Sequence, residues 1–556
     1  MALQLSKMGF NMVRLHLLDA PWAEENLFDP AYEDTRHFSK RSLERLDYFV
    51  AQLKRRGIYV YLDLLCRRNF KKGDGVAAYP RLEAGAKGVA MYDRRLIELQ
   101  KEFAREFLTH FNPYTKTKMV DEPAVALLDI INESSLFRFS REGTPPPFYR
   151  LELEALWEKY CRENKIRPFD AARLRDAQAP EVQRFYARLQ ERYFDEMAAY
   201  LRGLGLKIPL SGSNLPLQDA DLETNRRLDF IDRHAYWDHP QGGFGDLVKF
   251  HNGLLTQSRD YRNPIVKLSR EHVAGKPFVA GEWNIAWPNE YRAAGPALIA
   301  AYALFQDWQG LLQFNYGGDP NAEKIEGNFD ISNKPEIFLQ WPSIALFFHR
   351  RDLRPAQEIA SYPLFYQGEI PEALSFIHGI RRTEPESAAR ALGAEPGTRA
   401  MPSDTGELLW DSEKGHATIQ TSRTEAFIGR NPGEVRLKVL AFRSPARFAS
   451  VFLTSLDGEP LKISKHLLLT AVGRSENKGT VYNAARTFLR KSGGPPILME
   501  PIRGVFSLNA QRRRGAHLYA LDSRGVREKN FSPEADAGPF TFELGTSFVY
   551  EIFPEG

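Results

Sequence analysis

Short apolar runs and longer amphipathic stretches alternate along the first 350 residues. The apolar runs are rich in β-branched and aromatic residues, as strands are, and the stretches between them carry apolar residues at helical spacing. Regular alternation of this kind predicts parallel βαβ units, whose strands are buried on both faces. The seven predicted strands are Met12–Leu17, Ile58–Leu65, Val125–Ile131, Ile208–Ser213, Phe230–Tyr236, Phe278–Trp283 and Leu311–Tyr316.

The amphipathic stretches also carry helix signals. Residues 42–57, SLERLDYFVAQLKRRG, place leucine, phenylalanine and valine on one helical face and end at Gly57. Glycine commonly ends a helix because it adopts the left-handed conformation without strain. Residues 94–111 and 180–205 show the same apolar spacing, so we predict helices there.

Both a doubly wound sheet and a closed barrel fit this order of elements. A nucleotide-binding sheet would show a glycine-rich turn after an early strand, and the sequence has none. Polar side chains instead follow nearly every strand, where a (β/α)8 TIM barrel builds its active site. These side chains are Arg14, His16, Asp63, Asn132, Glu133, Ser213, Asn214, His234, Tyr236, Glu282 and Asn315. We therefore predict an α/β chain whose residues 1–350 form a (β/α)8 barrel, with the first strand lying upstream of residue 1.

The pattern changes after residue 350. Residues 382–405 are rich in Ala, Pro, Gly, Ser and charge, so residues 351–405 are predicted to be a connector. From residue 406 to residue 556, short alternating runs follow one another with turn residues between them. This pattern predicts a C-terminal antiparallel β-sandwich, and it contains no convergent acids that would suggest catalysis.

Charge and composition exclude several classes of function. The net charge is only +4 over 556 residues, with no basic face of the kind that nucleic-acid binding requires. No apolar stretch is long enough to cross a bilayer, and the first fifteen residues do not resemble a signal peptide. Cys66 and Cys161 could form one disulfide or remain two thiols. His and Cys do not recur at metal-ligand spacing, so we predict no metal and no cofactor, and a metal-dependent barrel hydrolase is disfavoured.

Two glutamates at strand ends carry the candidate chemistry. Glu133 follows the apolar run VALLDII, and Glu282 ends KPFVAGE. In a parallel barrel, residues at the ends of strands three apart face one another across the mouth. Glycoside cleavage needs one carboxylic acid to protonate the leaving oxygen and one carboxylate to attack the anomeric carbon. Nearby aromatic residues could stack on sugar rings.

The joint pattern resembles clan A of the glycoside hydrolases. The segments GFNMVRLH, VALLDIINESSL, DRHAYW and KPFVAGEWN are similar to the family 5-like branch, which includes cellulases, mannanases and β-galactosidases. The resemblance covers residues 5–350 and implies a retaining (β/α)8 enzyme that cleaves β-linked glycans. It implies that Glu133 is the general acid/base, protonated at rest, and that Glu282 is the nucleophile, held ionised by Arg14 and Tyr236. The implied substrate-binding residues are Arg14, His16, Asn132, His234, Tyr236, Trp283 and Phe314.

The sequence departs from that family at the last strand. Many clan members place a Trp there under the reactive sugar, whereas LLQFNYGG offers Phe314 and Tyr316. A second interpretation therefore stays open, in which the chain is a catalytically impaired or non-enzymatic carbohydrate-binding protein on the same fold. Hydrolysis of aryl β-glycosides that depends on Glu282 would separate the two.

Overall fold

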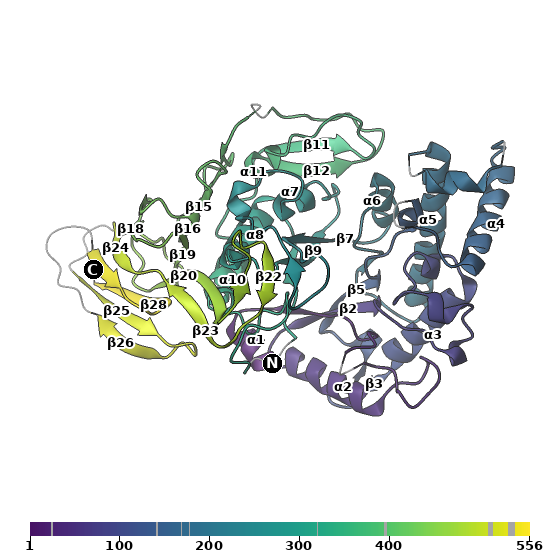
Figure 1. Ribbon diagram of the computed structural model, residues 1–556, viewed down its shortest axis with the longest axis horizontal. Helices are drawn as coiled ribbons and strands as arrows, with labels where there is room; N and C mark the ends of the chain where they lie inside the picture. The colour runs from purple at the N-terminus through teal and green to yellow at the C-terminus, as the bar shows by residue number, and fades with distance from the viewer. Residues whose placement is uncertain are drawn as a thin grey trace.

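The computed structural model describes residues 1–556 except 24–25, 141–142, 168, 177, 318, 320, 394–396, 510–514, 532–539 and 556. Helices surround parallel strands in the first part of the chain, and antiparallel sheets follow (Figure 1). The helices α4 (Pro147–Glu163) and α5 (Pro180–Gly203) lie at one end of the molecule, and the C-terminal sheets lie at the other.

Seven parallel strands form two sheets in the first 350 residues. The four-stranded sheet has the order β1 (Met12–Leu15), β2 (Tyr59–Leu65), β5 (Val125–Ile131) and β6 (Leu210–Ser211). The three-stranded sheet has the order β10 (Gly310–Gln313), β9 (Phe278–Ile285) and β7 (Ile231–Trp237). Each strand overlaps one of the seven predicted runs, although β6 and β10 are shorter than predicted, because the strands of a parallel sheet are rich in apolar residues.

The strand order follows the chain order, as in a (β/α)8 barrel, but closure differs from the complete form. Among the described residues, no eighth strand joins either sheet, and β1 and β10 are edge strands that lie next to each other. Three residues of β1 and all of β10 are half-buried, whereas every residue of β9 is buried. A groove of about 280 Å³ separates these edges, lined in part by Met12–Leu15 and Leu311–Gln313.

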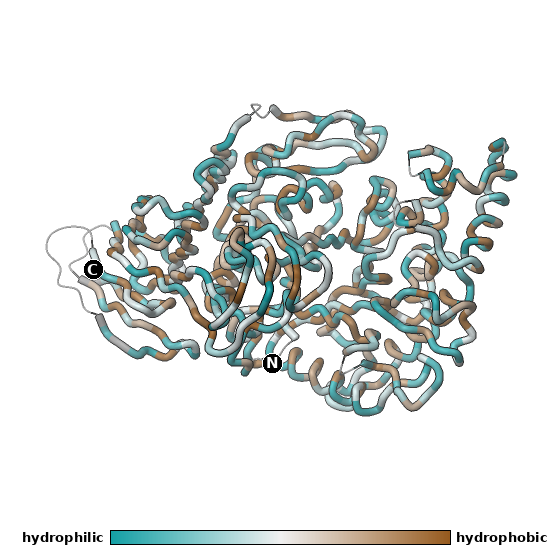
Figure 2. Tube along the Cα trace, viewed as in Figure 1, coloured by the Kyte–Doolittle hydropathy of each residue, from teal (hydrophilic) through white to brown (hydrophobic). Residues whose placement is uncertain are grey.

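Local signals fix the helices that cover these strands. Ser39 caps α2 (Lys40–Lys54) by accepting a hydrogen bond from the Ser42 amide, and Asp93 caps α3 (Arg94–Thr109) through the Leu96 amide. Hydrophilic and hydrophobic residues alternate along such outer helices (Figure 2). The shorter covering helices are α1 (Ala2–Lys7), α6 (Asp219–Asn225), α7 (Pro264–Ser269), α8 (Gly295–Phe305), α9 (Pro335–Phe338) and α10 (Trp341–His349). None of the helices in the described part of the chain has the length and apolar character needed to span a membrane.

In the described residues, most of the C-terminal part forms two antiparallel sheets that share one core, while β21 (Val481–Tyr482) and β22 (Phe488–Lys491) form a small third sheet with β8 (Val248–Lys249). A 10-stranded sheet begins at β13 (Ala400–Pro402) and contains β16 (Thr424–Arg430), β19 (Phe448–Ser455), β20 (Leu467–Lys478) and β28 (Val549–Glu555). A four-stranded sheet has the order β17 (Glu434–Arg436), β18 (Leu440–Arg443), β24 (Gly504–Leu508) and β27 (Phe540–Leu544). Buried side chains from both sheets form a single cluster, which includes Phe442, Val451 and Phe506.

Residues 351–405, predicted to be a connector, contain regular secondary structure. They hold β11 (Ile359–Pro363), α11 (Leu374–Ile377) and β12 (Gly379–Thr383), and they also supply β13 to the large sheet. The strands β11 and β12 pair in parallel, and Arg382 forms a bridge to Val273 beside the parallel strands. The polar composition hid these elements because a two-stranded sheet on the surface needs only a few apolar residues.

Candidate active site

The end of β5 places Glu133 in a turn with an unusual backbone conformation. Glu133 has φ +45°, a left-handed conformation that costs free energy in a residue with a side chain. Asn214 and Ser213, in the loop after β6, hold this turn. The Glu133 amide donates to Asn214 Oδ1 at 2.6 Å, and the Ser134 amide donates to Ser213 Oγ at 3.0 Å. The strand-end residues of β5 and β6 therefore meet, as the sequence predicts.

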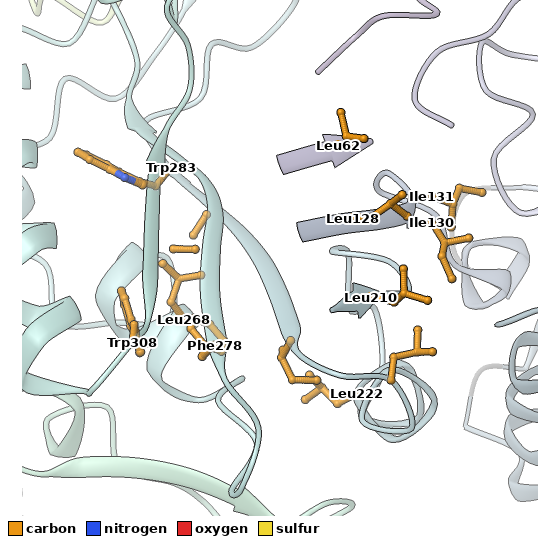
Figure 3. Close-up of a cluster of buried hydrophobic side chains, with 14 of the residues drawn as sticks. Leu62, Leu128, Ile130, Ile131, Leu210, Leu222, Leu268, Phe278, Trp283 and Trp308 are labelled. Carbon is orange, nitrogen blue, oxygen red and sulfur yellow. The ribbon is translucent and has the colours of Figure 1, made fainter. Parts of the chain in front are cut away.

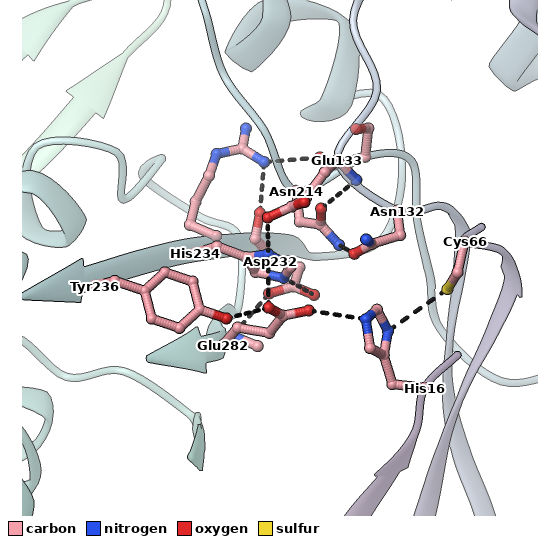
Figure 4. Close-up of polar contacts among 12 residues, drawn as sticks. His16, Cys66, Asn132, Glu133, Asn214, Asp232, His234, Tyr236 and Glu282 are labelled. Atoms are coloured by element: carbon pink, nitrogen blue, oxygen red, sulfur yellow. Dashed lines mark hydrogen bonds and ion pairs between the residues drawn. The ribbon is translucent and has the colours of Figure 1, made fainter. Parts of the chain in front are cut away.

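Glu282, on β9, lies between two donors from other strands (Figure 4). Arg14 Nη1 donates to Glu282 Oε1 at 2.8 Å, and the Tyr236 hydroxyl donates to the other carboxylate oxygen. Burial and the negative charge of Glu282 both raise the pKa of Tyr236, so its hydroxyl keeps its proton. These are the two contacts that the resemblance implies, and they fix the orientation of the Glu282 carboxylate.

His234, on β7, lies between the two glutamates. One oxygen of each carboxylate and a nitrogen of His234 lie within 4.8 Å of one another. Arg14 Nη1 is 2.9 Å from His234 Nε2, and a guanidinium can only donate, so Nε2 is the acceptor. The ring proton is therefore on Nδ1, which lies 3.2 Å from Glu133 Oε1 and 3.5 Å from Glu282 Oε2.

Asn132 presents a free amide group to this space. Its Oδ1 accepts hydrogen bonds from Arg14 Nη2 at 3.0 Å and from Asn214 Nδ2 at 3.1 Å. Its Nδ2 is buried and has no hydrogen-bond partner among the described residues. A buried donor without a partner is costly, so the geometry favours a ligand that accepts this hydrogen bond.

His16 is fixed from the side opposite Glu282. Its Nδ1 is hydrogen-bonded to the Asp63 carboxylate, and its Nε2 lies 3.4 Å from Glu282 Oε1. Burial alone would raise the pKa of Asp63, but the charge of Arg14 and the bond to His16 outweigh this effect and lower it to about 2. Asp63 is thus a negative charge that orients both Arg14 and His16.

The charge state of Glu133 contradicts the sequence-based prediction. Burial would raise the pKa of Glu133, but the hydrogen bond from His234, followed by the charges of Lys87 and Arg67, holds this pKa well below its usual range. We expected Glu133 to be the less paired acid and to carry a proton at rest. The contacts of Glu133, at 3.2–3.5 Å, are indeed longer than those of Glu282 with Arg14 and Tyr236. The protonation part of the prediction was wrong because Lys87 and Arg67 lie in a loop, where no periodicity indicates which way a side chain points.

Trp283 is a second correction, because it does not line the site. It is 1% exposed, and it points away from β2 and β5 (Figure 3). Successive residues of a strand face opposite sides, so a strand that turns Glu282 inward must turn Trp283 toward the covering helices. Trp283 accordingly packs against Gly295 and Trp341.

Aromatic residues form one wall of the site. The Phe314 ring lies 5.6 Å from the His16 ring and 6.1 Å from the Tyr236 ring. Phe329, which the sequence did not single out, is 5.0 Å from Tyr236 and 5.7 Å from Phe314. This wall offers apolar faces beside Glu282, where stacking on a sugar ring requires them.

Among the described residues, two groups of side chains have the spacing of metal ligands. Glu133, His234 and Glu282 form one group, in which the His234 nitrogen that faces the carboxylates carries the ring proton and would have to lose it to bind a metal. His16, Asp63 and Cys66 form the other, with Cys66 Sγ 3.5 Å from His16 Nδ1. Burial, together with Asp63 and Asp19, raises the pKa of the Cys66 thiol well above its ordinary value, which opposes metal binding. Cys66 and Cys161 are both free and buried.

Comparisons with known proteins give structural likeness only. No protein-family model and no curated protein matches the sequence. An endo-β-1,4-mannanase from Thermotoga petrophila has 12% identity and a TM-score of 0.41, over 85% of this chain and 90% of that chain. A GH5_18 structure from Streptomyces cattleya in complex with GlcNAc has 12% identity and a TM-score of 0.43, over 68% and 87%. A family 5 mannosidase from Rhizomucor miehei has 13% identity and a TM-score of 0.40, over 63% and 86%. Likenesses at these scores do not assign an activity, so we argue function from the site.

Proposed function

We propose that this chain is a retaining β-glycoside hydrolase that cleaves β-linked oligo- or polysaccharides by double displacement. The observation that carries the proposal is the pair of carboxylates, Glu133 and Glu282, with oxygens within 4.8 Å of each other. Retaining enzymes hold their two carboxyl groups about 5–5.5 Å apart, whereas inverting enzymes need a wider gap for water.

In the first half-reaction, Glu282 attacks the anomeric carbon. Arg14 and Tyr236 orient its carboxylate, since each donates to a different carboxylate oxygen. Glu133 passes a proton to the glycosidic oxygen as the bond to the leaving sugar breaks. The free Asn132 amide donates to the hydroxyl beside the anomeric carbon, a contact that strengthens in the transition state.

In the second half-reaction, water replaces Glu282 at the anomeric carbon. Glu133, now a carboxylate, takes a proton from that water, and Glu282 leaves as a carboxylate. The charge state of Glu133 at rest suits this second step, because a carboxylate is the form that acts as a base. The product keeps the anomeric configuration of the substrate.

Variants of the two glutamates test the proposal. Wild type should hydrolyse at least one member of a panel of nitrophenyl β-glycosides and soluble β-glycans, and Glu282→Gln should abolish this. Glu133→Ala should slow both steps, and azide should partly restore turnover of the activated aryl glycosides because it needs no base. Product that first forms with inverted configuration, or turnover that survives in Glu282→Gln, would rule out double displacement.

A catalytically impaired carbohydrate-binding protein is the second candidate function. The low pKa of Glu133 favours it, because an ionised Glu133 has no proton to donate. On this alternative, titration calorimetry would detect oligosaccharide binding by wild type, and no product would form after prolonged incubation. Turnover that depends on Glu282 excludes it.

A further inference from the structure

Two cations flank Glu133 on the side away from Glu282. The loop between β2 and α3 supplies both of them. Lys87 Nζ lies 3.4 Å from Glu133 Oε2, and Arg67 Nη2 lies 3.5 Å from the same oxygen. The other oxygen, Oε1, faces His234. The two oxygens of one carboxylate thus point to different surroundings, of which one is strongly positive.

Glu133 does not fully satisfy the hydrogen-bond donors of either cation. Charge-assisted N–H···O bonds are typically about 2.7–2.9 Å, and both contacts are longer. Within the described part of the chain, the Lys87 and Arg67 side chains have no other hydrogen bond or ion pair. The Lys87 side chain is only 8% exposed, and burial is the main cause that lowers its pKa. Burying an ammonium with so little compensation is costly unless a ligand completes its shell.

The backbone holds both cations in place. The amides of Cys66 and Arg67 donate to the Asp19 carboxylate at 2.8 and 2.9 Å. The Gly88 amide, next to Lys87, donates to Ser134 Oγ at 2.9 Å. Gly88 has φ +78°, and a Cβ there would lie 2.7 Å from the Phe139 ring, so the chain can make this approach only with glycine. The position of Lys87 beside Glu133 is therefore built into the loop.

We propose that Lys87 and Arg67 form a subsite for an anionic group, a carboxylate or a sulfate ester, on the leaving sugar of the substrate. This inference rests on the proposed function, because it places the leaving sugar beside the residue that protonates the glycosidic oxygen. The bound anion pairs with both cations and neutralises them. Their hold on the Glu133 carboxylate then weakens, and Glu133 can take up the proton that the first half-reaction needs. The substrate class is therefore an acidic β-glycan.

Matched substrates test the subsite. They are three β-linked disaccharides whose leaving residue is a uronic acid, its neutral methyl ester, or a 6-sulfated sugar. For wild type, kcat/KM should be roughly 30-fold or more higher for the preferred anionic substrate than for the methyl ester, which is the range for a buried charge contact. Lys87→Met should bring that ratio close to one, and Lys87→Arg, which keeps the charge, should retain most of it. Lys159→Met, an exposed charge loss on α4, is the control and should leave the ratio unchanged.

A binding measurement separates failure of the subsite from failure of the proposed function. The same disaccharides are titrated into Glu282→Gln and into Glu282→Gln/Lys87→Met, in which no turnover is expected. Tighter binding of an anionic disaccharide that is lost with Lys87 supports the subsite even if wild type hydrolyses nothing. Equal affinity for the anionic and neutral disaccharides overturns the subsite, and hydrolysis of the methyl ester would then leave the glycosidase proposal standing. The uronate and sulfate arms show which anion fits.

Discussion

At the scale of single residues, the two glutamates differ in the charge that surrounds them. Glu282 accepts hydrogen bonds from Arg14 and Tyr236, whereas Glu133 lies beside Lys87 and Arg67, and His234 is close to both carboxylates. Carboxylates in one cleft take different roles when their surroundings differ. In the free protein, the lowered pKa of Glu133 opposes the proton donation that the proposed first half-reaction needs, which makes the charge of the ligand important.

The pH dependence of kcat/KM should report how Lys87 affects the protonation of Glu133. Removing the Lys87 charge removes a cation that favours the Glu133 carboxylate, so the pKa of Glu133 should rise. For a neutral aryl glycoside, the basic limb of the kcat/KM profile belongs to the acid that must be protonated, so this limb should move to higher pH in Lys87→Met. Lys159→Met should not move it. A basic limb that is unchanged in Lys87→Met would show that Lys87 does not control Glu133.

Asp63 makes the stability of the protein depend on pH. Its pKa is lowered from 3.8 to about 2 in the folded chain, so the stabilisation is fully present above about pH 4 and is lost as the pH falls through about 2. Asp63→Asn should lower the free energy of unfolding at neutral pH by about 2 kcal/mol. Urea unfolding at several pH values should show the gap between wild type and variant narrowing toward pH 2. A gap that stays constant with pH would contradict this account.

The strand-end residues of the site could be predicted from the sequence, and its loop residues could not. Asn132, Glu133, His234 and Glu282 follow apolar runs, and parallel strands bring such positions to one mouth. Lys87 follows no apolar run, because it lies in a loop. Its position beside Glu133 depends on the path of that loop, which Gly88 and the Asp19 carboxylate determine. Trp283 directly follows Glu282 in the sequence, but successive side chains of a strand face opposite sides. Trp283 therefore does not share the site with Glu282.

At the scale of elements, β1 and β10 are two of the four edge strands of the parallel sheets, the others being β6 and β7. A groove lies between β1 and β10 and leaves the unpaired side of each strand open. The sequence placed all seven strands because each needs an apolar run. The absent first strand that the pattern predicts would pair with both β1 and β10, so the pattern also predicted that these two strands are edges.

Hydrogen exchange should distinguish these edges. Backbone amides of β1 and β10 that face the groove should exchange faster than amides of β2, β5 and β9, which have partners on both sides, because exchange follows local opening. Mass spectrometry of peptides that cover each strand would measure this. Equal protection across all these strands would mean that the groove is filled in solution.

At the scale of the whole molecule, a buried ion pair connects the barrel-like part to the C-terminal sheets. Arg292 Nε donates to Glu336 Oε1 at 2.9 Å, and both side chains are 1% exposed. Ser475, on β20, donates to Glu336 Oε2 at 2.5 Å and accepts from Arg292 Nη2 at 3.1 Å. The two parts therefore share polar groups that neither could satisfy alone in a dry interior.

Breaking this pair should destabilise both parts together. Glu336→Ala leaves Arg292 buried without its partner, which typically costs about 3–5 kcal/mol. Calorimetry should show a lower melting temperature with both parts still unfolding in one transition. Asp260→Ala, which breaks an exposed pair with Arg262, should cost less than about 1 kcal/mol. Two separate transitions in Glu336→Ala, with one at the wild-type temperature, would show that the parts fold independently.

The sequence pattern indicated a part with parallel strands and a part with antiparallel strands, but it did not indicate where one ends and the other begins. Alternating runs indicate antiparallel strands wherever they occur, and this located the C-terminal sheets. The polar segment 351–405 gave no such signal, yet it supplies β13 to the large sheet and β12 to the side of the parallel strands. Interfaces between parts use ordinary polar residues, so a composition profile does not show them.

The shortness of β1 has a consequence for how this protein would fail. This strand has four residues and an open edge, yet Arg14 on it bonds to Glu282, Asp63, Asn132 and His234. A molecule in which β1 has detached would keep most of its core and both glutamates, but Glu282, the proposed nucleophile, would have lost the guanidinium of Arg14. The chain would then be folded but inactive, so activity would be lost under milder conditions than the fold.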